Sequence, residues 1–168
     1  MSRNIRRRRR AGNAGLDRAS SVTGGTLAVT GMPTTTVLFA CVHNAGRSQM
    51  AAALFNLEAD PAKAAAISAG TQPGPHVHPE VVEAMREIGV DLSGARPRRL
   101  TDDLARRARF LITMGCGEVC PTVPGAMRAD WPLQDPRGQP IERVREIRED
   151  IRARVRRLIE QHGWGRSR

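Results

Sequence analysis

One segment of eight residues concentrates the side chains that could carry out nucleophilic chemistry. It reads CVHNAGRS, with Cys41 at its start, Arg47 six positions later and Ser48 at its end. A tight turn between the cysteine and the arginine would point successive backbone N–H groups inward, and such a nest binds anions, especially at a helix N-terminus. Arg47 adds a planar fork of donors that matches a tetrahedral oxyanion. The segment therefore predicts an oxyanion-binding loop made of Val42, His43, Asn44, Ala45, Gly46 and Arg47.

Cys41 would lie at the floor of this loop, where positive surroundings favour the thiolate over the thiol. We expect it to be an ionised nucleophile at neutral pH, opposite the bound oxyanion. Asn44 could fix the turn, because asparagine tolerates the left-handed backbone conformation. An inert buried thiol is the ordinary interpretation of a cysteine at a strand end, but the spacing to Arg47 favours catalysis. For Ser48, two interpretations stay open, a helix cap and a hydrogen-bond donor to the thiolate.

A nucleophile that attacks a tetrahedral oxyanion needs a proton donor for the departing oxygen. Asp135 is the best candidate, because it precedes Pro136 in a loop rich in proline and glycine. The proline favours an extended conformation at Asp135 and stiffens the loop. The alternative is an ordinary turn, since Asp-Pro is a common turn pair.

Two more cysteines, Cys116 and Cys120, follow a predicted strand and are four residues apart. In a helical segment they would lie one turn apart, close enough to pair. Half of a zinc site is a weak alternative because no second pair of ligands lies nearby, and we predict no metal site. A purely structural disulfide is disfavoured in a reducing cytosol.

Alternating strands and helices would position these residues. Strands are expected over 34–42, 65–69, 109–114 and 126–130, and helices over 48–57, from 79 to about 87, over 101–108 and over 141–162. Ser48 is the expected N-cap of the first helix, and Thr101 or Asp102 that of the third. The first strand is continuously apolar, which predicts burial on both faces of a parallel sheet. The alternation predicts an α/β fold whose ligands bind at the carboxyl ends of the strands.

The 168 residues suit one domain, and the net charge of +10 is unevenly distributed. Residues 1–31 hold seven arginines and one aspartate, a net +6, which leaves +4 for the rest of the chain. We expect residues 1–33 to be a disordered Arg-rich extension, 34–163 the domain and 164–168 a short tail. A basic arm for nucleic acid is the less favoured alternative. No apolar run of about 18 residues exists, so no membrane span is predicted.

Taken together, the motifs resemble the low-molecular-weight protein tyrosine phosphatase superfamily, and most of all its arsenate reductases. The matching segments are VLFACVHNAGRSQMA (37–51), ISAGTQP (67–73), LITMGCGEVCP (111–121) and DWPLQDPRG (130–138). The resemblance implies a three-layer α/β fold, with a four-stranded parallel sheet flanked by helices. It also implies Cys41 as nucleophile, Arg47 and the loop amides as oxyanion binders, and Asp135 as general acid.

The resemblance further implies arsenate as substrate, arsenite as product and arsenic detoxification as the role. In a phosphatase of this family, water hydrolyses the cysteinyl-phosphate, whereas in a reductase a second thiol attacks the cysteinyl-arsenic adduct. Phosphomonoester hydrolysis is the alternative activity. The absence of tyrosine, and Arg137 directly after Pro136, favour a small inorganic oxyanion over an aromatic ester.

The source of the second thiol stays open at this point. Cys116 and Cys120 could form an internal relay that thioredoxin reduces. Their short spacing also resembles a branch in which mycothiol resolves the adduct and mycoredoxin completes the cycle. Both routes need an external thiol reductant. We expect no bound cofactor and a cytoplasmic location.

Overall fold

The computed structural model describes residues 35–117, 120 and 122–167, so the predicted extension at 1–33 lies outside the described residues. The strands are β1 (Thr35–Cys41), β2 (Ala64–Gly70), β3 (Phe110–Thr113) and β4 (Met127–Asp130). They form one sheet in the order β2-β1-β3-β4, with all three neighbouring pairs parallel. The helices are α1 (Arg47–Glu58), α2 (Pro79–Arg86), α3 (Asp102–Arg107) and α4 (Ile141–His162). The predicted α/β class and parallel sheet are confirmed, whereas the domain boundaries stay a prediction.

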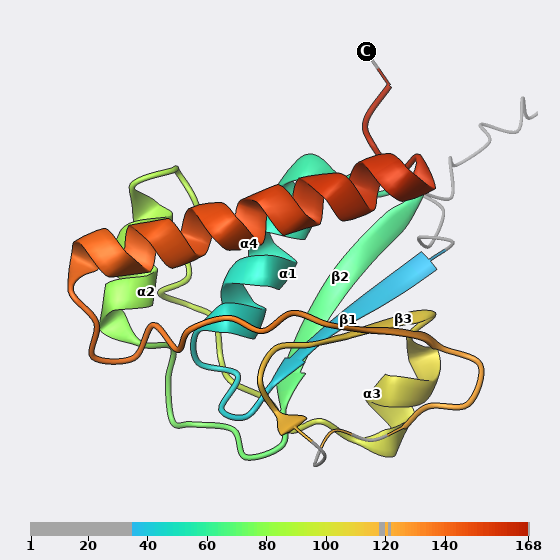
Figure 1. The fold of residues 1–168 in the computed structure, drawn as a ribbon, viewed down its shortest axis with the longest axis horizontal. Helices are drawn as coiled ribbons and strands as arrows, with labels where there is room; N and C mark the ends of the chain where they lie inside the picture. Colours follow the sequence, from blue (N-terminus) through green and yellow to red (C-terminus); the bar gives the residue numbers. More distant parts are fainter. Residues whose placement is uncertain (1–34, 118–119, 121, 168) are drawn as a thin grey trace, which may run out of the picture.

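Side chains of β1 alternate between two apolar layers. Val37, Phe39 and Cys41 join the larger core, which contains residues of α1, α2 and α4. Leu38 and Ala40 join a smaller cluster with residues of α3. Figure 1 shows the corresponding arrangement, with α1, α2 and α4 on one side of the sheet and α3 on the other. Because strand side chains alternate with a period of two, β1 is buried on both faces, as its apolar sequence predicts.

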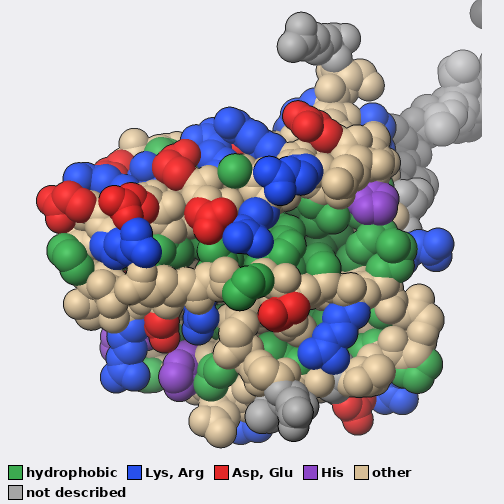
Figure 2. Space-filling view, viewed as in Figure 1, with side chains coloured by type: hydrophobic (Ala, Val, Ile, Leu, Met, Phe, Trp, Pro, Cys, Tyr) green, Lys and Arg blue, Asp and Glu red, His purple; other side chains and the backbone are tan. Residues whose placement is uncertain are grey.

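The long helix α4 packs one apolar stripe into the larger core, beside α1 and α2, and exposes a charged surface. Its buried residues recur at spacings of three and four, as the sequence predicts. Figure 2 shows basic and acidic side chains interleaved along the outer surface of this helix. Among the described helices, none combines the length and the apolar character needed to cross a bilayer.

Two glutamates connect α4 to the helices beside it. Glu58, at the end of α1, accepts hydrogen bonds from Arg152 at 2.7 Å and Arg156 at 2.8 Å. Desolvation alone would raise the pKa of Glu58, but the hydrogen bonds from the two guanidinium groups outweigh it and hold the pKa below its usual value. Glu87, just after α2, similarly accepts from Arg145 and Arg148. These contacts join the C-terminal ends of α1 and α2 to α4.

Candidate active site

The loop that joins β1 to α1 lies at the carboxyl edge of the sheet. In the strand order, β2 lies on one side of β1 and β3 on the other. The connections that follow β1 and β2 therefore run to opposite sides of β1. Such a point in an open α/β sheet is where ligands bind. The segment 41–47 occupies this point, as the sequence predicts.

The carbonyl groups of this loop are turned outward. The amides of residues 71, 72, 74 and 78 donate to the carbonyl oxygens of Cys41, Val42, His43 and Ala45 at 3.2, 2.8, 2.9 and 2.8 Å. In a planar trans peptide, the N–H points away from the C=O, so the amide after each of these carbonyls faces the inside of the loop. Asn44 demonstrates this, because its N–H lies 3.2 Å from the Cys41 sulfur. The loop therefore turns the amides that follow these four carbonyls toward its inside, and the Asn44 amide reaches the thiol.

The Cys41 sulfur is buried and has two hydrogen-bond partners. Its Sγ lies 2.9 Å from Ser48 Oγ and accepts from the Asn44 amide. Ser48 Oγ in turn accepts from Asn44 Nδ2 at 2.8 Å, which leaves the serine proton free to point at the sulfur. Cys41 forms no disulfide and is only 3% exposed. The arrangement stabilises negative charge on the sulfur with donors from both partners.

Asn44, predicted as a member of the oxyanion loop that fixes its turn, also holds this arrangement together through its side chain. It is fully buried and adopts the left-handed conformation expected for it, with φ of 49°. Its Oδ1 accepts from Gln49 Nε2 at 3.1 Å and from the Arg98 amide at 3.0 Å. These two donors identify the oxygen of the amide, so the nitrogen must face Ser48. Gln49 and Arg98 were not predicted, because they reach Asn44 only through the folded chain.

Ser48 is not the N-cap of α1, so that interpretation is wrong. The helix begins at Arg47, its N-cap is Gly46, and no side chain caps it. The physical reason is competition, because Ser48 Oγ is occupied by Cys41 and Asn44. By contrast, Thr101 is the N-cap of α3, and its Oγ1 accepts from the Leu104 amide at 3.2 Å.

Arg47 lies at the mouth of the loop between two other segments. Its Nη1 donates to the Leu133 carbonyl at 3.0 Å, and its Nη2 lies 3.7 Å from Asp135 Oδ2. On the opposite side it contacts Gly115, where an added Cβ would lie 2.6 Å from Nη1. Gly115 has φ of +85°, a backbone conformation that favours glycine, and a side chain there would also displace the end of the Arg47 side chain. Neither Leu133 nor Gly115 was predicted, although the glycine directly before Cys116 was a signal.

Asp135 faces the loop from the segment that precedes α4. Its Oδ1 accepts from the Arg137 amide at 3.0 Å, and its side chain is 46% exposed. The neighbouring Pro136 is buried against Gly46, where an added Cβ would lie 2.8 Å from the proline ring. The structure therefore brings Cys41, Arg47 and Asp135 to one place.

The two later cysteines lie elsewhere. Cys116 and Cys120 form a disulfide, with Cα atoms 5.8 Å apart, so the pairing that their spacing allowed is present. Both are buried in the cluster on the α3 side of the sheet, whereas Cys41 belongs to the core on the other side. Cys116 Sγ lies 3.9 Å from the carbonyl oxygen of Ala40, the residue before Cys41. The disulfide is thus near the end of β1 but on the opposite face from the nucleophile.

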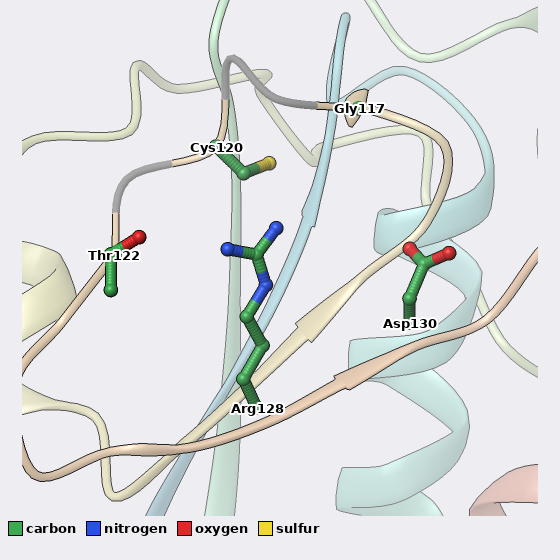
Figure 3. Close-up of a pocket in the computed structure, with 5 residues that line it drawn as sticks. All are labelled: Gly117, Cys120, Thr122, Arg128 and Asp130. Carbon is green, nitrogen blue, oxygen red and sulfur yellow. The ribbon is translucent and has the colours of Figure 1, made fainter.

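A surface cavity of about 490 Å³ opens beside this disulfide. Its described lining is Gly117, Cys120, Thr122, Arg128 and Asp130, and it does not include Cys116. Figure 3 shows the Arg128 guanidinium extending from β4 toward Cys120. Asp130, the other charged residue of the lining, has a carboxylate that accepts from the Thr113 hydroxyl at 2.6 Å. Cys120 is thus the half of the disulfide that borders this cavity, together with the positive charge of Arg128.

A second cavity, of about 400 Å³, adjoins the oxyanion loop. It is lined by His43, Ala45, 74–76, 78–80, Arg137 and Gly138. Burial holds the pKa of His78 below its usual value, despite the nearby carboxylates of Glu80 and Asp135. Within the part of the chain that the structure describes, no three His, Cys, Asp or Glu side chains are grouped to hold a metal ion.

The sequence and the fold were compared with those of known proteins. A protein of Halobacterium salinarum named "Putative arsenate reductase" is 42% identical over 132 residues, which cover 76% of this chain and 93% of that protein. The glutaredoxin arsenate reductase of Synechocystis is 35% identical, over 73% of this chain and 95% of its own. A solved thioredoxin-dependent arsenate reductase of Corynebacterium glutamicum superposes with a TM-score of 0.68 and 44% identity, over 78% of this chain and 63% of that one.

The family comparison covers nearly all of the described residues. The model for low molecular weight phosphotyrosine protein phosphatase matches residues 36–163, which run from the second residue of β1 to the residue after α4. The match contains the loop 41–47, both later cysteines and Asp135. The chain therefore belongs to the low molecular weight phosphotyrosine protein phosphatase family.

Proposed function

We propose that this protein is an arsenate reductase that converts arsenate to arsenite in arsenic detoxification. One observation carries the proposal: a free thiol in a donor-lined oxyanion loop coexists with a separate pair of bonded cysteines in the same domain. A phosphatase needs only the first of these. The arsenate reductases among the relatives and solved structures support the same activity.

In the first half of the reaction, arsenate occupies the loop in front of Cys41. The inward amides and the Arg47 guanidinium bind its oxygens, and Arg47 exchanges its contact with the Leu133 carbonyl for the anion. The Cys41 thiolate attacks arsenic, so a sulfur–arsenic bond forms and an arsenic–oxygen bond breaks. Asp135, in its protonated form, donates its proton to the departing oxygen, which leaves as water.

In the second half, Cys116 attacks the sulfur of the Cys41 adduct. A sulfur–sulfur bond forms and the sulfur–arsenic pair of electrons stays on arsenic, which is thereby reduced from As(V) to As(III) and leaves as arsenite. Cys120 then attacks Cys116, which releases the Cys41 thiolate and leaves the Cys116–Cys120 disulfide. Free Cys41 together with bonded Cys116 and Cys120 is the state expected after the last of these reaction steps.

An external dithiol must then reduce the Cys116–Cys120 disulfide. We propose a thioredoxin-type protein in place of mycothiol and mycoredoxin. A dithiol protein reduces disulfides by thiol–disulfide exchange, and this chain contains such a disulfide. Cys120 lines the open cavity, so it is the sulfur that the reductant attacks, and Cys116 leaves as the thiolate. We place the protein in the cytoplasm, where such reductants are supplied continuously.

The test is arsenite formation with either of two reducing systems, thioredoxin with its reductase or mycothiol with mycoredoxin. Turnover with thioredoxin that is lost in Cys41→Ser, Cys116→Ser and Cys120→Ser supports the relay. Turnover with mycothiol that needs Cys41 alone would replace the relay by the external route. Rapid hydrolysis of an aryl phosphate without any thiol, together with no arsenite from arsenate, would refute the reductase function.

A further inference from the structure

Residues 133–138, which we call the acid segment because they carry Asp135, are held to the rest of the site at three points. Arg47 donates to the carbonyl of Leu133 at 3.0 Å. Pro136 packs against Gly46 so closely that no side chain would fit between them. At the far end, the Gly138 amide donates to the carboxylate of Glu80 at 2.6 Å.

The third contact comes from outside the oxyanion loop, at the first turn of α2. That helix is well anchored, since Val81, Ala84 and Met85 are completely buried. Its start is also tied to the oxyanion loop, because the His78 amide donates to the Ala45 carbonyl at 2.8 Å. The backbone that carries Glu80 is therefore held at a fixed position relative to the loop.

Substrate and the acid segment compete for the guanidinium donors of Arg47. An oxyanion in the loop needs the same guanidinium donors that now contact Leu133 and approach Asp135. When the anion takes them, the contact of Pro136 and the hydrogen bond to Glu80 remain. The Glu80 bond then has the larger part in keeping the segment in place at the moment of proton transfer.

A short path connects Gly138 to the Asp135 carboxylate. The Gln139 amide donates to the Pro136 carbonyl at 3.1 Å, which closes a tight turn around Gly138, whose φ is +68°. Within that turn the Arg137 amide donates to Asp135 Oδ1, which leaves Oδ2 as the oxygen nearest Arg47. Displacing Gly138 would therefore turn Oδ2 away from the mouth of the loop.

We propose that Glu80 is a positioning residue, which acts through Gly138 to keep Oδ2 of Asp135 aimed at the oxygen that leaves arsenate. This proposal rests on the proposed function and names no new chemical step. Loss of the contact is expected to reduce the rate of the arsenate step about tenfold, because small misplacements of a catalytic group carry large kinetic costs.

The experiment measures kcat/KM for arsenate at saturating reductant in Glu80→Ala, Glu80→Gln and Glu83→Ala. Glu83 is the matched control, an exposed acid on the same helix. Glu80→Ala is expected to lose about tenfold, whereas Glu80→Gln, which keeps an acceptor oxygen, and Glu83→Ala stay within about twofold of the wild type. Competitive inhibition by phosphate reports the oxyanion loop and should not change.

The decisive comparison repeats Glu80→Ala in an Asp135→Asn background. If Glu80 acts through Asp135, its removal there lowers kcat/KM by less than about twofold, because the proton donor is already absent. Equal losses in both backgrounds, or no loss in Glu80→Ala alone, would overturn the proposal. An Asp135→Asn variant as active as the wild type would overturn it as well. Failure of the proposed function would look different, because the wild type itself would form no arsenite.

Discussion

Replacing Gly115 with alanine tests whether Arg47 needs the space beside that residue to bind an oxyanion. The new Cβ would lie 2.6 Å from Arg47 Nη1, whereas ordinary contact begins at 3.4 Å, so the guanidinium must retreat by 0.8 Å. A misplacement of about 1 Å in a catalytic site costs up to about 10²-fold in rate. We therefore expect kcat/KM for arsenate to fall between about 10-fold and 100-fold.

The same substitution also strains the backbone, and this second effect must be separated from the first. An alanine with positive φ costs about 1–2 kcal/mol relative to glycine. Gly125 provides the matched control, because its φ of +84° equals that of Gly115 within a degree, but nothing lies within 4 Å of its added Cβ. Gly115→Ala and Gly125→Ala should therefore lose similar stability in urea denaturation.

The assay is initial-rate arsenite formation against arsenate concentration, with thioredoxin held saturating. Only Gly115→Ala should lose kcat/KM, and it should also raise the inhibition constant of phosphate, which needs the same guanidinium. If the two variants have equal kcat/KM, the contact between Gly115 and Arg47 has no part in oxyanion binding. The assignment of Arg47 as an oxyanion binder would then lose its structural support.

Three further changes probe the thiol, the reduction step and the fold. Ser48→Ala removes a donor to the Cys41 sulfur, so alkylation of Cys41 by iodoacetamide at neutral pH should slow about tenfold; an unchanged rate would contradict the stabilising role. Arg128→Ala should slow reduction of the disulfide at Cys120 by thioredoxin several-fold and leave kcat/KM for arsenate unchanged; identical reduction rates would exclude a role for this charge. Glu58→Gln should cost about 1 kcal/mol of unfolding free energy at pH 7. Because the pKa of Glu58 is lowered in the folded state, the difference from the wild type should be full above about pH 5 and vanish as the pH falls through the folded value, measured by urea denaturation across pH; a difference that persists at low pH would mean that packing, and not charge, is responsible.

The elements of the fold were largely predictable from local pattern. The apolar stripe of α4 gave its bounds, 141–162, because a period of 3.6 over six turns leaves little ambiguity. The continuous apolar run of β1 predicted its central, doubly buried position. The order of the strands and the assignment of each helix to a face depend on contacts between distant segments, which no local pattern specifies.

The candidate site also has one part that local sequence predicts and another that depends on contacts between distant segments. Cys41 and Arg47 were predictable, because their spacing along one loop fixes their relation. The partners that complete the site come from other parts of the chain: Leu133 and Glu80 contact it through one hydrogen bond each. Of the two interpretations left open for Ser48, the helix cap is wrong and the hydrogen bond to the Cys41 sulfur is present, because the folded structure offers the hydroxyl a buried partner that local pattern cannot show.

The alternation of side chains along β1 determines which sulfur atoms can meet while the protein is at rest. Cys41 shares its face with Val37 and Phe39, and the bonded pair shares the opposite face with Leu38 and Ala40. A cysteine at position 40 would lie in the same apolar compartment as the disulfide, open to exchange with it and to loss of its nucleophile. In the present register the free thiol and the disulfide lie on opposite faces of β1, so the proposed attack of Cys116 on the Cys41 adduct requires the Cys116 side chain to pass around the end of that strand.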